Sequence, residues 1–100
     1  MKITLTQTEM IDAVAIYGAR EQRIPLDRLS VELFYEENKG FYANIYQDGS
    51  HTPYIVSEQQ MIDAVAGFLR DYHRFEPGRM EIELFYEEDR GFSVEVETNR

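Results

Sequence analysis

Apolar positions follow first a helical and then an extended spacing, and this order occurs twice along the chain. In residues 7–22 and 58–74 apolar side chains recur every three or four positions, as on one side of a helix. In residues 29–47 and 80–98 apolar and polar side chains alternate, which is typical of strands with one buried face. A short apolar stretch precedes each helix. The pattern predicts two copies of a unit made of a leading strand, a helix and a hairpin.

The second half of the chain repeats the first at an offset of 51 residues. Residues 1–49 align with residues 52–100 without a gap and share 16 identities, including Met-Ile-Asp-Ala-Val-Ala and Glu-Leu-Phe-Tyr-Glu-Glu. Two units are too few for a solenoid, and 100 residues leave little room for two independent cores. We therefore expect a tandem duplication of a (β)αββ unit within one α+β domain, residues 1–100, with pseudo-twofold symmetry.

Capping signals stand where each helix is expected to begin. Thr6 is followed three residues later by Glu9, and Ser57 by Gln60. Each pair predicts a capping box, in which the two side chains satisfy free backbone N–H groups. One apolar residue does not fit the pattern, because Ile16 falls on the side of the first helix that we expect to face solvent.

The turn between the paired strands sets the expected register. Asn38-Lys39-Gly40 and its counterpart in the second copy resemble three-residue hairpin loops with a left-handed glycine. That loop places Leu33 opposite Ile45 and Leu84 opposite Val96, with the apolar side chains on one face. The simplest assembly is one antiparallel sheet containing both hairpins, with the two helices packed on this face. The other face of the sheet would be open.

Composition and charge limit the partners. The chain is 43% hydrophobic, contains no cysteine, and carries 19 acidic against 10 basic residues, for a net charge of −9. Nucleic acids and anionic membranes would be repelled, so we expect neither as a partner. Thiol chemistry and disulfides are excluded, and the N-terminal residues lack the apolar core of a signal peptide. We expect a cytoplasmic bacterial protein, for which a basic protein partner remains open.

The sequence carries no recognisable motif for catalysis or metal binding. His51 and His73 are the only histidines, and neither has the spacing of a metal ligand. The sequence has no nucleophile elbow and no glycine-rich phosphate loop. We therefore predict a protein that is not an enzyme, with no catalytic, cofactor-binding or metal-binding residues.

Aromatic side chains occupy positions on the open face of the predicted sheet. Phe34 and Phe85 are identical between the copies, and Tyr42 and Tyr46 share their side of the hairpin. Large exposed apolar patches usually mark interaction surfaces, although cross-strand neighbours could also bury these rings in part.

Carboxylates share this face. The predicted register places Glu83 opposite Glu97, with Glu95 as a diagonal neighbour. Facing like charges are unfavourable, so arginines such as Arg28 or Arg79, a divalent cation or exposure to water would have to relieve the repulsion.

We accordingly predict a non-enzymatic interaction or assembly protein that uses this acidic and aromatic face, as a homodimer or with a basic partner. The alternative is a small module that binds a ligand or a cation on the same face. The expected interaction residues are Phe34, Tyr42, Tyr46, Glu83, Phe85, Glu95 and Glu97.

Three segments together carry a resemblance to a known family. Met-Ile-Asp-Ala-Val in the helix, Val-Glu-Leu-Phe-Tyr-Glu-Glu in the strand and Gly-Phe at the turn resemble the small YxcD-like proteins of Bacillus and its relatives. The resemblance covers nearly the whole chain and rests on structural motifs. It implies a cytosolic protein of a Gram-positive bacterium, and it implies no activity and no functional residues.

Overall fold

The computed structural model describes residues 1–74 and 79–98, which form an α+β fold with two helices and two antiparallel sheets. The elements follow the order β1 (Lys2–Leu5), α1 (Gln7–Gln22), a 3-10 turn η1 (Leu26–Arg28), β2 (Leu29–Glu36), β3 (Gly40–Gln47), β4 (Tyr54–Ser57), α2 (Glu58–His73), β5 (Met80–Glu87) and β6 (Gly91–Thr98). Both helices and both hairpins lie where the hydrophobic pattern predicts them.

Capping boxes start both helices, as predicted. The Glu9 N–H donates to Thr6 Oγ1 at 3.2 Å, and the Thr6 N–H donates to Glu9 Oε1 at 3.0 Å. Ser57 and Gln60 repeat this arrangement at the start of α2. Each box satisfies N–H groups that a helix leaves without partners in its first turn.

The prediction of a single sheet is wrong, because the strands form two three-stranded sheets. Their strand orders are β1–β6–β5 and β2–β3–β4. The leading strand of each half thus pairs with the hairpin of the other half: Ile3 lies opposite Val96, and Ile45 lies opposite Tyr54. These pairings occupy the free edges of β6 and β3, so β2 and β5 remain as outer strands and do not join the hairpins into one sheet.

The predicted register of the hairpins is also wrong, by two residues. Glu36 pairs with Gly40, so the loop consists of residues 37–39 and Leu33 lies opposite Ala43. Gly40 does have a positive φ, 75°, but it belongs to the strand pair and lies just outside the loop. Because side chains alternate with a period of two, a shift of two residues leaves every side chain on its predicted face.

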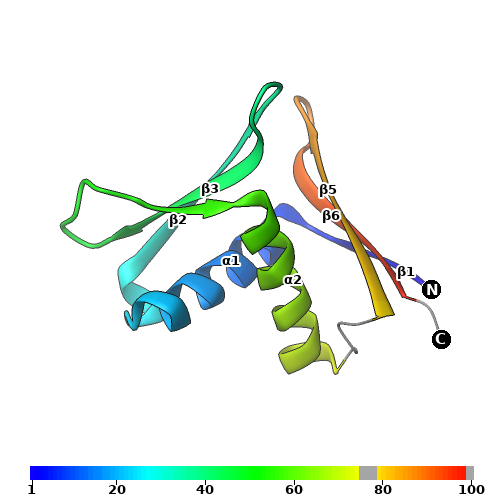
Figure 1. Ribbon diagram of the computed structural model, residues 1–100, viewed down its shortest axis with the longest axis horizontal. Helices are drawn as coiled ribbons and strands as arrows, with labels where there is room; N and C mark the ends of the chain where they lie inside the picture. The colour runs from blue at the N-terminus through cyan, green and yellow to red at the C-terminus, as the bar shows by residue number, and fades with distance from the viewer. Residues whose placement is uncertain (75–78, 99–100) are drawn as a thin grey trace.

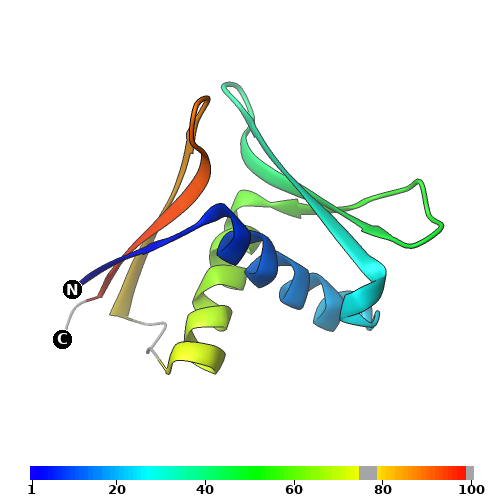
Figure 2. The same ribbon diagram turned by 180° about the vertical axis from the view of Figure 1, so that it is seen from behind.

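The two sheets lean together at their hairpin tips and diverge below them, with both helices beneath (Figure 1, and from behind in Figure 2). Helix α1 contacts β2, β3 and β6, while α2 contacts β3, β4 and β5, so each helix bridges the two sheets. Buried apolar residues from both halves form one core cluster, which includes Met10, Val14, Met61 and Val65. Leu84 is buried within it, whereas Leu33 is only half-buried.

Within the described residues, neither helix is long and apolar enough to cross a membrane.

Candidate functional site

The residues expected to form one interaction face lie on two different sheets. Phe34, Tyr42 and Tyr46 project from the outer face of β2–β3–β4. The remaining four, Glu83, Phe85, Glu95 and Glu97, project from the outer face of β5–β6 in the other sheet. The expectation of a single mixed face is therefore wrong, because it depended on the two hairpins sharing a sheet. We call the first surface the aromatic face and the second the acidic face.

The aromatic face is built around a cross-strand pair of rings. Phe34 stacks on Tyr42 with ring centroids 5.0 Å apart and planes inclined by 11°. The Tyr42 hydroxyl donates to Glu36 Oε2 at 2.7 Å, and this hydrogen bond to a carboxylate raises the pKa of Tyr42 above its usual value. The two rings are only partly exposed, so the stack already removes some of their surface from water.

The centre of the aromatic face has an exposed aliphatic side chain and an unpaired polar atom. Ile55 of β4 is 61% exposed and lies directly opposite Asn44 of β3. The Asn44 amide nitrogen is 3.5 Å from the Tyr46 hydroxyl, which is a weak hydrogen bond. Asn44 Oδ1 is buried and accepts no hydrogen bond. Turning the amide over would bring Oδ1 to the Tyr46 hydroxyl, which can donate to it, so the chain itself can satisfy this group.

The acidic face brings four carboxylates together around one lysine. In the observed register Glu81 lies opposite Glu97 and Glu83 opposite Glu95, so the predicted Glu83–Glu97 pairing is corrected. Lys2 of β1 reaches Glu95 at 2.8 Å, and this hydrogen bond raises the pKa of the Lys2 ammonium. The repulsion is thus relieved in part by a lysine on the neighbouring strand, which sequence reasoning did not consider. Among residues 1–74 and 79–98, no three His, Asp or Glu side chains are grouped to hold a metal ion.

An aromatic cluster joins the two sheets at the hairpin tips. Tyr35 stacks on Tyr86 with centroids 5.9 Å apart, and Phe41 meets Phe92 edge-on at 6.2 Å. Side chains at the helix starts fix this region: the Phe92 N–H donates to the Gln7 amide oxygen at 2.9 Å, and the equivalent Phe41 N–H donates to a Glu58 carboxylate oxygen at 3.0 Å. These contacts connect the halves of the chain.

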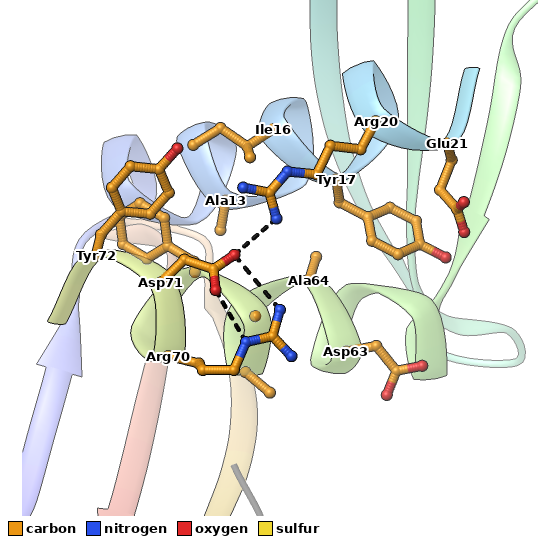
Figure 3. Close-up of a pocket in the computed structure, with 13 residues that line it drawn as sticks. Ala13, Ile16, Tyr17, Arg20, Glu21, Asp63, Ala64, Arg70, Asp71 and Tyr72 are labelled. Carbon is orange, nitrogen blue, oxygen red and sulfur yellow. Dashed lines mark hydrogen bonds and ion pairs between the residues drawn. The ribbon is translucent and has the colours of Figure 1, made fainter. Parts of the chain in front are cut away.

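A groove of about 410 Å³ separates α1 from α2 on the side away from the hairpin tips (Figure 3). Its floor includes the small residues Ala13 and Ala64, which are almost fully buried. Aromatic and aliphatic side chains line one end, where Tyr72 packs on Phe68 with centroids 5.4 Å apart and Ile16 lies close by. Sequence reasoning missed this site because its walls come from helices in different halves. The apolar Ile16 on a side expected to face water was the one available signal.

An ion cluster crosses the middle of the groove. Asp71 accepts hydrogen bonds from Arg20 at 2.7 Å and from Arg70 Nε at 2.9 Å. Together these hydrogen bonds, first from Arg70 and then from Arg20, lower the pKa of Asp71 from 3.8 to about 2. The cluster contains two cations and one anion, so the middle of the groove carries one net positive charge.

Acidic and hydroxyl groups line the other end of the groove. Figure 3 places Tyr17, Glu21 and Asp63 beyond the ion cluster, on the far side from Tyr72. Burial raises the pKa of the Tyr17 hydroxyl, and the negative charge of Glu21 adds to this effect. The groove therefore presents an apolar end, a cationic middle and an anionic end.

Comparison with known proteins identifies the family of this chain. A family model described as "Protein of unknown function (DUF2653)" matches residues 1–77 and, separately, residues 52–100. The chain is 31% identical over 100 residues to the uncharacterized protein YxcD of Bacillus subtilis (strain 168), covering 99% of this chain and 96% of that protein. No solved structure matches. The predicted resemblance is confirmed, and the chain belongs to the DUF2653 family.

Proposed function

We propose that this protein is a non-enzymatic assembly protein, and that two copies pair through their aromatic faces. The observation that supports this most directly is Ile55, which is 61% exposed on the face that also carries Phe34, Tyr42 and Tyr46. An isolated exposed aliphatic residue would be unremarkable, but here it shares a surface with three partly exposed aromatic rings. Covering one such side chain is worth roughly 1.5–3 kcal/mol.

Charge favours self-pairing of this face over the acidic one. Glu32 and Glu36 hold outward positions on β2, and Glu36 is already engaged by Tyr42 and by Lys39 at 3.7 Å. A twofold contact between aromatic faces thus brings few like charges together, whereas a twofold contact between acidic faces would oppose four carboxylates on each side. Because the carboxylates of the acidic face lie on the other sheet, they would not oppose one another when two aromatic faces pair.

The two halves differ at several positions of these outer faces, which supports a specific role for one of them. Under a tandem duplication, Tyr42, Asn44 and Tyr46 correspond to Ser93, Glu95 and Glu97, and Ile55 corresponds to Thr4. We propose such a duplication on the strength of the 51-residue repeat and the separate family match to residues 52–100. We assign to assembly the face with fewer carboxylates, which combines the hairpin of the first copy with β4 of the second.

Matched charge substitutions on the two faces test the proposal. The variant Ile55→Asp with Phe34→Asp should convert a wild-type dimer into a folded monomer, as measured by light-scattering mass and far-ultraviolet circular dichroism. The control Thr4→Asp with Phe85→Asp makes equivalent changes on the acidic face and should leave the dimer intact. A wild-type chain that is monomeric at millimolar concentration would overturn the proposal, and so would a dimer that both double variants leave unchanged.

A further inference from the structure

A glycine in the middle of α2 has no packing reason to be there. Gly67 is in the interior of the helix, where glycine costs about 1 kcal/mol relative to alanine. A Cβ at Gly67 would meet only the end of Arg70, at 3.7 Å, which is an ordinary contact. At Gly18 of α1, by contrast, an added Cβ would overlap Ile45 Cδ1. Close packing therefore explains Gly18, while Gly67 keeps open the groove that it lines.

Unused donors point into the same groove. A guanidinium group has five N–H donors, and Asp71 engages one from Arg20 and two from Arg70. The remaining donors sit between the apolar end of the groove and its anionic end (Figure 3). Arginine pairs bind carboxylates well because their N–H groups match the two oxygens in geometry.

We propose that this groove binds a free amino acid with an apolar, preferably aromatic, side chain. Its side chain would pack against Ile16, Phe68 and Tyr72, and its carboxylate would bind the free donors of Arg20 and Arg70. Its ammonium group would lie toward Glu21 and Asp63. The groove volume of about 410 Å³ is within the range of small-molecule sites and exceeds that of one amino acid.

The mixed charges favour a zwitterion over a simple anion or cation. A carboxylic acid without an amine would meet Glu21 and Asp63 in a chain of net charge −9, which repels anions. An amine without a carboxylate would leave the positive charge of the ion cluster unmatched. A ligand carrying both charges satisfies both ends of the groove, and its apolar side chain completes the match.

Calorimetric titration of the full chain with L-phenylalanine tests this site. Two analogues separate the contributions of the ammonium group and the carboxylate to binding. 3-Phenylpropionate lacks the ammonium group and phenethylamine lacks the carboxylate, and each should bind at least about tenfold more weakly than L-phenylalanine. Arg70→Gln should weaken L-phenylalanine binding by a similar factor. Gly67→Leu should abolish binding by filling the groove while the protein stays folded.

Two control variants test whether L-phenylalanine binds in the groove and not on another surface. Glu95→Gln, on the acidic face, should leave L-phenylalanine affinity unchanged, and Ile55→Asp should do the same whether or not it alters assembly. Absence of binding by the wild-type chain at millimolar L-phenylalanine would overturn the inference. Equal binding by wild type and by Gly67→Leu would overturn it as well, because the ligand would then occupy another site.

Discussion

The substitution Gly18→Ala is expected to destabilise the protein even though alanine is the better helix former. Gly18 is buried against β3, where a Cβ would overlap Ile45 Cδ1 and lie 3.5 Å from Ile45 Cγ2. Alanine gains about 1 kcal/mol of helix propensity. Overpacking of a filled core costs about 1–3 kcal/mol, and Ile45, at 2% exposure, has little room to move. The net expectation is a loss of about 0–2 kcal/mol.

The same substitution at the other helical glycine is the matched control. Gly67→Ala meets no overlap, so it should stabilise the protein by about 0.5–1 kcal/mol. Ile45→Val removes Cδ1 and alone should cost about 0.5–1.5 kcal/mol. In the double variant Gly18→Ala with Ile45→Val the overlap is gone and the new methyl fills the vacated space. Stability should then return to within about 1 kcal/mol of wild type, a favourable coupling between contacting sites.

Urea melts of the four variants, followed by circular dichroism, give these free energies if the slopes stay constant. The reasoning would be refuted if Gly18→Ala stabilised the protein as much as Gly67→Ala does. It would also be refuted if the two changes at Gly18 and Ile45 were simply additive, because additivity would mean that the two side chains do not compete for the same space.

Two further predictions concern the sheets and the ion cluster. Leu84→Ala should lower the free energy of unfolding by about 2–5 kcal/mol because Leu84 is buried in the core. Phe85→Ser, on the outer face, should lower it far less. Urea melts that rank the two variants in the reverse order would show that the strand faces are misassigned. The pKa of Asp71 is lowered in the folded state, so its ion pairs stabilise the protein above pH about 4 and this contribution is lost as the pH falls toward about 2. The difference in urea midpoint between wild type and Asp71→Asn should therefore be present at pH 6 and shrink as the pH falls from about 4 toward about 2, and an undiminished difference at pH 2 would contradict the assignment.

The elements of this fold were predictable because their signals are local. Thr6 with Glu9 and the helical spacing that follows them set the start of α1 without reference to the rest of the chain. The hairpin faces were predictable for a similar reason, since an error of two residues at Gly40 does not exchange the faces.

The division into two sheets was not predictable, because it depends on long-range strand pairing that no local signal specifies. Residues 2–5 and 54–57 are both short and apolar, and either could have extended the hairpin of its own half. The pairing Ile3–Val96 instead places β1 in the second half's sheet. Because the two hairpins do not share a sheet, Glu83, Glu95 and Glu97 lie on a different surface from Tyr42 and Tyr46, and the predicted residues do not form one group.

Equivalent positions of the two helices meet one another where α1 packs against α2. Arg20 and Asp71 correspond under the 51-residue repeat, and their side chains bond to each other across the helix pair. In a symmetric pair of identical units, the same contact would oppose two arginines or two aspartates, which repel. Within one chain, the two positions can carry opposite charges and attract. The same freedom allows Ile16 to correspond to Gly67, and both residues line the groove between the helices. The lining of the groove thus differs between its two helices, and a pair of identical units could not present the same arrangement.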